Sequence, residues 1–148
     1  MNRIMRRQIE GKYSTVSDVQ LMTLPRVDLR SGSLTAINSL DQIPFEIKRV
    51  YFLYDVPNKS DRGAHAHKEL YQLIVPASGS FEITLFDGKD SKQFLLRQPD
   101  EGLLVPPGLW RDLSNFSGGG ICLVLASMLY TEEDYIRDLK YFRKFKNE

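Results

Sequence analysis

Between residues 71 and 127 the sequence is a nearly unbroken series of short apolar runs separated by turn residues. Asp87-Gly88 falls between two of these runs and is typical of a hairpin turn. Many short strands with glycine and proline between them, and no helix among them, favour a sandwich or barrel over a parallel sheet. We therefore predict an all-β fold whose strands include residues 71–76, 81–86, 93–97, 103–105 and 121–127.

The first third of the chain is less regular. Residues 1–18 are polar and weakly patterned, so we expect a flexible N-terminal extension, followed by a single domain over residues 19–148. Within that domain, a turn at 29–34 precedes a short predicted strand at 34–37, and a longer strand is predicted at 45–54. A chain of 148 residues is long enough to bury one substantial core.

The pattern changes from strand to helix near the C-terminal end. Thr131-Glu132-Glu133-Asp134 resembles a capping box that opens a helix, with acids in the first turn. Tyr135, Leu139 and Phe142 then recur at helical spacing, with Ile136 beside them. We predict a short C-terminal α-helix that begins at this box and packs its apolar stripe against the barrel.

Composition excludes several classes of protein. The net charge is +1, so no broad field attracts nucleic acid or a membrane surface. No apolar run reaches the roughly 18 residues of a membrane span, and the basic start lacks the apolar segment of a signal peptide. Cys122 is the single cysteine and lies in an apolar run, which indicates a buried small side chain. The absence of a disulfide within one chain fits a reducing cytoplasm.

Both histidines of the chain lie in one short stretch, separated by one residue. On an extended strand alternate side chains share a face, so His65 and His67 point the same way, about 7 Å apart along the chain. The pair therefore faces either a pocket or bulk water. Exposed pairs of this kind without a role are common, and the surrounding motifs decide between the two alternatives.

The predicted strand at 45–54 carries a charged residue on an apolar face. Arg49 either lies at a barrel mouth with its head in solvent or contacts a ligand, and a guanidinium holds phosphate through a planar fork of donors. Arg62, just before the histidines, is a second candidate for such a contact. The residues that share the face of Arg49 are Phe45, Ile47, Tyr51 and Leu53.

Two motifs place the histidine pair in a known type of site. The pair is followed by Gln72 and Gly79, and later by Pro106-Pro107-Gly108-Leu109-Trp110-Arg111. These blocks resemble the two motifs of the cupin superfamily. The resemblance implies a double-stranded β-helix, or jelly-roll barrel, whose metal-binding members use two His and a Glu from the first motif and a His from the second.

This sequence departs from the metal-binding pattern at two positions. Gln72 stands where metal cupins have the Glu, and Arg111 stands where they have the second-motif His. A guanidinium has no lone pair to give and carries a fixed positive charge where the cation would lie. We therefore expect no metal and no other cofactor. The imidazoles would then be free for acid and base catalysis.

Five short runs carry a narrower resemblance, which covers about residues 27–142. The runs are Ile47-Lys48-Arg49-Val50-Tyr51, Arg62-Gly63-Ala64-His65-Ala66-His67-Lys68, Gly108-Leu109-Trp110-Arg111-Asp112, Leu125-Ala126-Ser127 and Glu133-Asp134-Tyr135-Ile136-Arg137. In this order and spacing they resemble the sugar 3,4-ketoisomerases of the WxcM-like cupin group. The resemblance implies a homodimer that exchanges an N-terminal strand and acts in the cytoplasm on dTDP-4-keto-6-deoxyglucose. The 3-keto product would lead to a dTDP-3-amino-3,6-dideoxy sugar for a lipopolysaccharide, O-antigen or S-layer glycan.

The resemblance also implies roles for individual residues. Moving a ketone from carbon 4 to carbon 3 requires a base and an acid in one pocket, and His65 and His67 are expected to share this work, with Tyr51 as a further proton carrier. Trp110 in the core and Asp134 as a helix cap are the structural alternatives to ligand contacts. The expected substrate contacts are Arg49 and Arg62 on the diphosphate, Gln72 at the sugar or histidines, Trp110 and Arg111 near the nucleotide or pocket wall, and Asp134 and Tyr135 at the base.

Two other functions stay open. One is a non-catalytic cupin that binds a nucleotide sugar, and the other is a metal-dependent cupin enzyme, which Gln72 and Arg111 disfavour. The histidine pair favours the isomerase, because a pure binder needs no acid and base. The configuration of the product at carbon 4, galacto or gluco, and the division of roles between the histidines stay open at this point.

Overall fold

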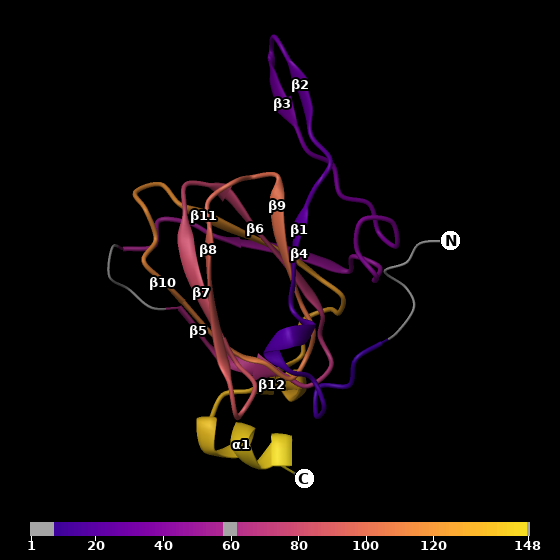
Figure 1. The fold of residues 1–148 in the computed structure, drawn as a ribbon, viewed down its shortest axis with the longest axis vertical. Coiled ribbons are helices and arrows are strands. Elements are labelled where there is room, and N and C mark those ends of the chain that lie inside the picture. The colour runs from indigo at the N-terminus through magenta and orange to yellow at the C-terminus, as the bar shows by residue number, and fades with distance from the viewer. Residues whose placement is uncertain (1–7, 58–61, 148) are drawn as a thin grey trace.

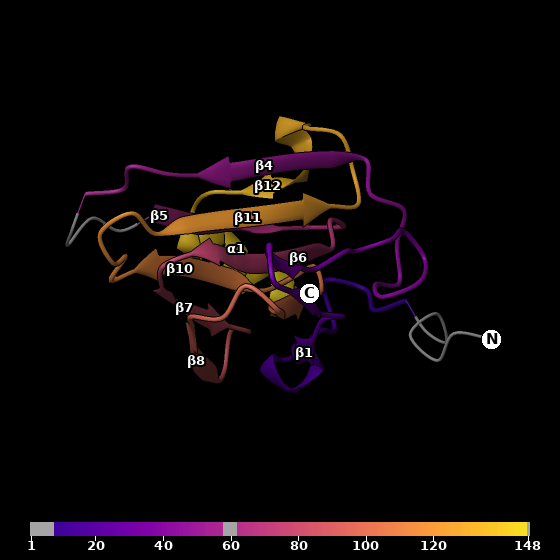
Figure 2. The same cartoon turned by 90° about the horizontal axis from the view of Figure 1, so that it is seen from above.

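The computed structural model describes residues 8–57 and 62–147. Two five-stranded antiparallel sheets face each other, one in the order β1-β9-β6-β11-β4 and the other in the order β12-β5-β10-β7-β8 (Figures 1 and 2). The hairpin β2-β3 projects from one end of the barrel, and helix α1 lies at the opposite end (Figure 1). This arrangement confirms the predicted all-β jelly-roll barrel with a short C-terminal α-helix.

Most strands fall where the alternating sequence pattern predicts them. The five strands predicted between residues 71 and 127 are confirmed as β6, β7, β8, β9 and β11, with ends shifted by at most two residues. The strands are Gln20–Thr23 (β1), Val27–Leu29 (β2), Gly32–Leu34 (β3), Arg49–Leu53 (β4), Arg62–His67 (β5), Gln72–Ser78 (β6), Phe81–Phe86 (β7), Ser91–Leu96 (β8), Glu101–Val105 (β9), Trp110–Ser114 (β10), Ile121–Ala126 (β11) and Tyr135–Ile136 (β12). The helical segments are the 3-10 turns Val16–Asp18 (η2) and Glu132–Asp134 (η3) and the α-helix Leu139–Asn147 (α1).

In the strands that form the barrel core, one face is apolar and turns inward. In β7, Phe81, Ile83 and Leu85 have no exposed surface, whereas the residues between them are partly exposed. They join a core that both sheets share and that includes Cys122 of β11. Burial raises the pKa of the Cys122 thiol to about 12, so its expected place as a small core side chain is confirmed. Burial of each large apolar side chain contributes about 1.5–3 kcal/mol, which holds the sheets face to face.

The loop before β4 covers the outer face of the first sheet. Ile43 and Phe45 are buried there against Leu73. The predicted strand at 45–54 is therefore wrong in its first part. The ladder with β11 starts at Arg49, because the preceding residues bury their apolar side chains on the outside of the sheet instead of pairing along its edge.

The projecting hairpin replaces the strand predicted at 34–37. β2 and β3 pair from Val27 and Leu34 to Leu29 and Gly32, so the turn is shorter than the predicted 29–34, β3 lies within that range, and residues 35–37 form no strand. Gly32 has a φ of +132°, which a residue with a side chain adopts only with strain. The short pairing leaves the apolar side chains of the hairpin exposed.

The C-terminal helix begins later than its capping signal predicts. Glu132–Asp134 form a 3-10 turn, and the Thr131 side chain makes no capping hydrogen bond. Tyr135–Ile136 then extend as β12 beside β5, and α1 starts only at Leu139. Because their backbone groups pair with those of β5, these two residues stay extended and do not join the helix. Within the described ranges, no helix is long and apolar enough to cross a membrane.

Part of the segment expected to be flexible makes specific contacts. Ser14 is buried, and Lys146 of α1 donates to the carbonyl oxygens of Gly11 and Ser14. Thr15 forms a capping box at the start of η2. Hydrogen bonds to the barrel and helix replace the apolar burial that the segment lacks. Residues 1–7 lie outside the described residues, and the domain boundary at Val19 stays a prediction.

The docking of α1 leads to a test of the C-terminal core. Phe142 has no exposed surface, and its ring centroid lies 5.7 Å from that of Trp110. Phe142→Ala is expected to lower the free energy of unfolding by about 3–5 kcal/mol in urea denaturation. Tyr141→Ala, on the exposed side of the helix, should cost less than about 1 kcal/mol. Equal losses in the two variants would contradict the docked position of α1.

Candidate active site

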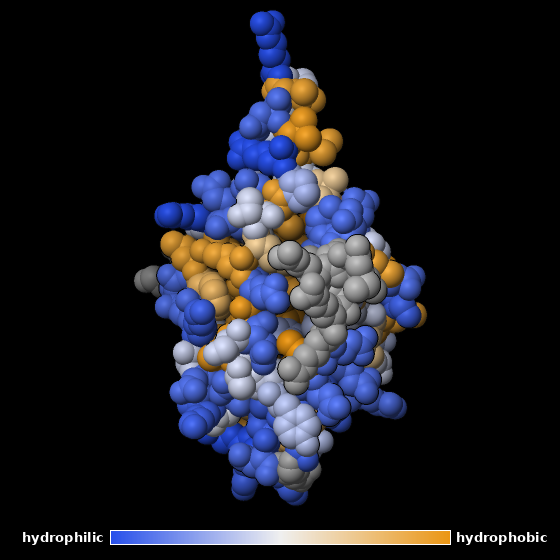
Figure 3. All heavy atoms as spheres, turned by 45° about the vertical axis from the view of Figure 1, so that its right-hand side comes forward, coloured by the Kyte–Doolittle hydropathy of each residue, from blue (hydrophilic) through white to orange (hydrophobic). Residues whose placement is uncertain are grey.

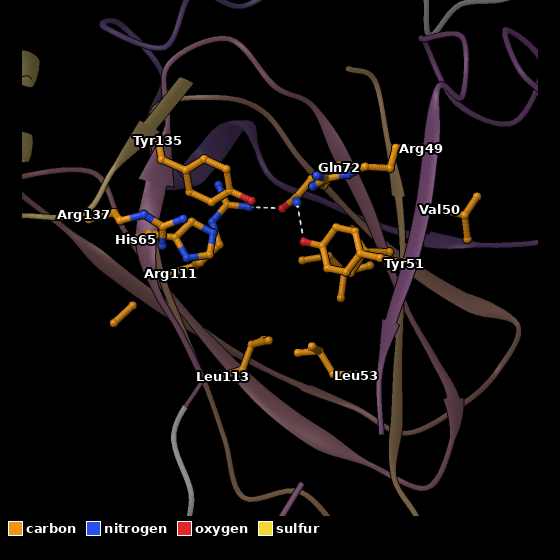
Figure 4. Close-up of a pocket in the computed structure, with 13 residues that line it drawn as sticks. Arg49, Val50, Tyr51, Leu53, His65, Gln72, Arg111, Leu113, Tyr135 and Arg137 are labelled. Atoms are coloured by element: carbon orange, nitrogen blue, oxygen red, sulfur yellow. Dashed lines mark hydrogen bonds between the residues drawn. The ribbon is translucent and has the colours of Figure 1, made fainter. Parts of the chain in front are cut away.

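A cavity of about 600 Å³ lies between the two sheets (Figure 4). Both sheets contribute to its wall, because alternate residues of their strands face inward. Arg49, Tyr51 and Leu53 of β4 line it, so this part of the predicted alternation is confirmed. The other lining residues are Val50, Ala64, His65, Gln72, Ile74, Arg111, Leu113, Val124, Tyr135 and Arg137.

Three polar side chains form a hydrogen-bonded network on the cavity wall. Arg111 donates through Nη1 to Gln72 Oε1 and through Nη2 to the carbonyl oxygen of Leu109 at 3.1 Å. Gln72 Nε2 donates to Tyr51 Oη at 2.9 Å, as the dashed lines of Figure 4 show. Arg111 is 2% exposed, and burial lowers the pKa of its guanidinium to about 10. Arg111 therefore remains a cation near neutral pH.

This network does not fit a metal site. Gln72 and Arg111 occupy the positions at which metal-binding cupins have a Glu and a His, and here they bond to each other. The Gln72 carbonyl oxygen is engaged by the guanidinium, which has no lone pair to offer a metal. Within residues 8–57 and 62–147, no group of three or more His, Cys, Asp or Glu side chains is placed to hold an ion.

His65 and His67 both turn to the interior of the barrel from β5. Their rings meet edge to face, with centroids 4.9 Å apart. Tyr135 lies against both rings, 5.0 Å from His65 and 4.4 Å from His67. His65 lines the cavity, and His67 behind it has no exposed surface. The alternative in which the pair faces bulk water is therefore wrong.

Asp134 fixes the orientation and the tautomer of His67. Asp134 Oδ2 lies 2.9 Å from His67 Nδ1, and Asp134 Oδ1 accepts from the amide of Glu69 at 2.7 Å. Because a carboxylate only accepts, Nδ1 of His67 carries the proton and Nε2 keeps its lone pair. Asp134 is 6% exposed and does not line the cavity. The observed partners of its carboxylate are His67 and the Glu69 amide, and the expected contact with the nucleotide base stays a prediction.

Burial sets the proton affinities of the two imidazoles. Burial, followed by the Arg111 cation, lowers the pKa of His65 to about 2. Burial also lowers the pKa of His67 to about 4, although the hydrogen bond to Asp134 opposes that shift. Both rings are neutral near pH 7, and His67 is the easier to protonate. Burial raises the pKa of Tyr51, so its phenol stays protonated.

Two arginines lie over aromatic rings at the cavity. Arg49 Cζ lies 4.8 Å from the ring centroid of Tyr51, and its buried Nε has no hydrogen-bond partner among the described residues. Arg137 lies 4.1 Å from the ring centroid of Tyr135 and pairs with Glu132 at 2.5 Å. Arg137 was not among the candidates chosen from the sequence. Its spacing of two from Tyr135 on an extended chain was the signal that both share a face.

The side chain of Trp110 does not line the cavity. Trp110 alternates with Arg111 along β10, so its ring points away from the cavity and packs against Phe142. The structure therefore shows a packing contact for Trp110, and its assignment to the substrate stays a prediction. Arg62 begins β5, but its side chain lies outside the described residues.

Two facing antiparallel sheets with a polar cavity between them, and a His-x-His pair on an inner strand, define this chain as a cupin-fold protein. The family model described as WxcM-like, C-terminal (FdtA) matches residues 17–147. The chain belongs to this family.

Relatives of known activity cover most of the chain. The TDP-4-oxo-6-deoxy-alpha-D-glucose-3,4-oxoisomerase of Aneurinibacillus thermoaerophilus is 43% identical over 114 residues, which are 77% of this chain and 82% of that protein. A 3,4-ketoisomerase from Helicobacter canadensis is 44% identical with a TM-score of 0.86, covering 88% of this chain and 98% of the other. QdtA, a sugar 3,4-ketoisomerase from Thermoanaerobacterium thermosaccharolyticum solved with TDP, is 35% identical with a TM-score of 0.87, covering 90% and 97%. The predicted family and enzyme class, an isomerase, are confirmed.

The buried pair leads to a prediction for its titration. In the free protein both imidazoles should stay neutral from pH 8 down to pH 5, because their pKa values are about 2 and about 4. Asp134→Asn removes the anion that favours the charged form of His67, so the pKa of His67 should fall further. Glu133→Gln, on the exposed neighbour, should leave it unchanged. Histidine NMR measures these values, and a ring that titrates near pH 6.5 would contradict the burial of the pair.

Proposed function

We propose that this chain is a sugar 3,4-ketoisomerase that converts dTDP-4-keto-6-deoxyglucose to the dTDP-3-keto-6-deoxy sugar. The observation that carries the proposal is the pair of buried, neutral imidazoles beside one cavity, one of them held by a carboxylate. The Aneurinibacillus relative is named for this reaction, and a QdtA variant was solved with TDP-4-keto-6-deoxyglucose. A protein that only binds a nucleotide sugar has no need of such a pair.

The reaction moves a carbonyl group between adjacent carbons without net oxidation. A base takes the proton on carbon 3, its bonding electrons form the double bond to carbon 4, and the carbon 4 oxygen gains a proton. The carbon 3 hydroxyl of this enediol then loses its proton as carbon 4 receives one. We assign the removal of the carbon 3 proton to His65, which lines the cavity. His67 would supply the proton that carbon 4 receives. Tyr51, whose phenol stays protonated, would donate to the carbon 4 oxygen.

Substrate binding would also make His65 a better base. In the free site burial and two cations, Arg111 and Arg137, hold its pKa down. We place the diphosphate on Arg49 and Arg137, whose planar forks suit phosphate oxygens, with Arg62 as a further contact. An anion at these positions favours the imidazolium, so proton affinity rises when the substrate is bound. The remaining cavity residues, Gln72, Arg111 and Tyr135, would face the sugar and nucleotide.

The reaction itself is the direct test. Protein treated with a chelator should convert dTDP-4-keto-6-deoxyglucose to a 3-keto isomer, and product NMR also gives the configuration at carbon 4. His65→Asn and His67→Asn should each lose about 10²- to 10⁴-fold in rate with an unchanged circular dichroism spectrum. Lys144→Met, an exposed control, should retain full activity.

Two results would contradict this assignment. Activity that disappears with the chelator and returns with iron or manganese would indicate a metal-dependent enzyme. Tight TDP binding without proton exchange at the sugar would indicate a non-catalytic binder.

The proposal includes a homodimer that exchanges N-terminal strands. Figure 3 shows apolar side chains along the projecting hairpin, and a two-stranded hairpin cannot bury them alone. The outer face of β4 is also apolar, so a second copy would supply a complementary surface. The exposed apolar residues are Val27, Leu29 and Leu34 on the hairpin, Val50 and Phe52 in β4, and Tyr54 just after it.

Light scattering after gel filtration tests the assembly. Two chains of 17.1 kDa should migrate together. Leu29→Asp combined with Leu34→Asp places charges on the apolar face and should shift the protein to monomers, whereas Ser33→Asp on the same hairpin should not. A monomeric wild-type protein at micromolar concentration would contradict the dimer.

The chemistry also indicates where the enzyme acts. The single cysteine is buried and unpaired, which suits the reducing cytoplasm that we propose as its location. The new ketone at carbon 3 is the group that an aminotransferase would replace to give a 3-amino-3,6-dideoxy sugar. We place that sugar in a surface glycan.

A further inference from the structure

The family match begins at residue 17, yet residues 8–16 pack at the end of the barrel that carries α1 (Figure 1). We call these residues the brace. Ser14 is 2% exposed, and its hydroxyl lies 2.6 Å from the carbonyl oxygen of Pro107. Lys146 Nζ on α1 donates to the carbonyl oxygen of Gly11 at 2.6 Å, to that of Ser14 at 2.8 Å and to the Ser14 hydroxyl at 3.0 Å. The brace and α1 therefore meet at this end of the barrel.

The brace approaches the barrel so closely that two glycines are required. A Cβ on Gly11 would lie 2.4 Å from the carbonyl oxygen of Lys68, and a Cβ on Gly108 would lie 1.8 Å from the carbonyl oxygen of Gly11. Gly108 also has a φ of +83°, which disfavours any side chain. The backbone of the brace thus lies directly on the backbone that follows β5 and on the turn before β10.

These contacts lead to one of the proposed catalytic histidines. The Gly108 amide donates to the carbonyl oxygen of His67 at 2.7 Å, and the Lys68 amide donates to that of Asp134 at 2.9 Å. Asp134 in turn holds the His67 ring. The brace therefore contacts Lys68 and Gly108, whose amides donate the hydrogen bonds to Asp134 and His67.

Lys146 holds the brace with a charge that is half withdrawn from water. Burial lowers the pKa of its ammonium group to about 8, while the carboxylates of Asp87 and Asp18 oppose the shift. Asp87 also accepts from the amide of Val16 at 3.0 Å, at the end of the brace. The three acceptors of the ammonium group all belong to the brace, so removing the charge loosens the segment at Gly11 and Ser14 without changing a residue of the cavity.

We propose that Lys146 is a positioning residue, which acts on His67 through the brace and the Pro107-Gly108 turn. This inference rests on the proposed function, because it assumes that His67 takes part in proton transfer. Release of the brace removes the backbone contact between Gly11 and Gly108. The Pro107-Gly108 turn, which is hydrogen-bonded to the His67 backbone, can then shift and move His67 with it. Since a misplacement of about 1 Å can lower a rate by about 10²-fold, the effect falls on turnover rather than on substrate binding.

Lys146→Met tests the proposal, because methionine keeps most of the length and loses the charge. Lys144→Met, on the exposed side of the same helix, is the matched control. For Lys146→Met we expect kcat to fall by about tenfold or more, with KM for the dTDP sugar changed by less than about twofold. Exchange of the Gly108 amide hydrogen should accelerate in this variant and not in the control.

Ser14→Ala is a milder second variant, since it removes the hydrogen bonds of the hydroxyl and leaves the charge of Lys146 with its two carbonyl acceptors. It should lower kcat in the same direction by a smaller factor. Normal kcat in Lys146→Met despite faster exchange at Gly108 would overturn the proposal, because the brace would then serve stability alone. A rise in KM with normal kcat would overturn it as well.

The proposed function and this inference can fail separately. Wild-type protein without isomerase activity would refute the function and leave the brace to be judged by NMR alone. In that case Lys146→Met should still move the ring resonances of His67, and Lys144→Met should not. Unmoved His67 resonances in Lys146→Met would overturn the role of the brace whatever the activity.

Discussion

The buried guanidinium of Arg111 is the constraint on which the site depends. Withdrawing a cation from water costs several kcal/mol unless hydrogen bonds compensate. The side chain of Gln72 and the carbonyl of Leu109 supply those bonds, and Tyr51 continues the network across the cavity. This positive charge, fixed in the wall, repels a metal cation. It also adds to burial in lowering the pKa of His65, whose imidazole stays neutral.

The same electrostatics separates the two histidines. His65 lines the cavity and lies close to cations, whereas His67 is enclosed and hydrogen-bonded to the carboxylate of Asp134. A ketone that moves between adjacent carbons needs one group that takes a proton and another that returns one. Because their surroundings differ, the two imidazoles can take these two different roles. An anionic diphosphate on the arginines would then act on His65 at the moment when a base is needed.

The parts of this site that depend on local periodicity could be predicted from the sequence. The inward direction of Arg49 and the shared face of His65 and His67 follow from the two-residue repeat of a strand. Gln72 and Arg111 were found through their spacing in two motifs. The hydrogen bond between His67 and Asp134 could not be predicted, because it depends on the pairing of β12 with β5, whose residues Tyr135 and His67 are far apart in sequence.

The sequence did not show which apolar side chains pack on the outside of the barrel. Trp110 was expected near the nucleotide or pocket wall, and Phe45 on the strand face of Arg49, but the barrel also has outer surfaces that α1 and the loop before β4 cover. A strand pattern identifies two faces and does not say which one is inside. The packing of the brace could not be predicted from the sequence. It is held by hydrogen bonds from Lys146 to its carbonyl oxygens and from Ser14 to Pro107, and a hydrophobic pattern does not show such bonds.

The central claim is that paired imidazoles, without a metal, move protons between adjacent sugar carbons. Solvent exchange tests it most directly, through turnover of dTDP-4-keto-6-deoxyglucose in heavy water with a chelator present. Proton transfer through two separate side chains predicts a product that carries deuterium on carbon 4, and no such product from His65→Asn. A product formed at full rate that keeps the original carbon 3 hydrogen on carbon 4 would indicate a hydride shift and contradict the claim.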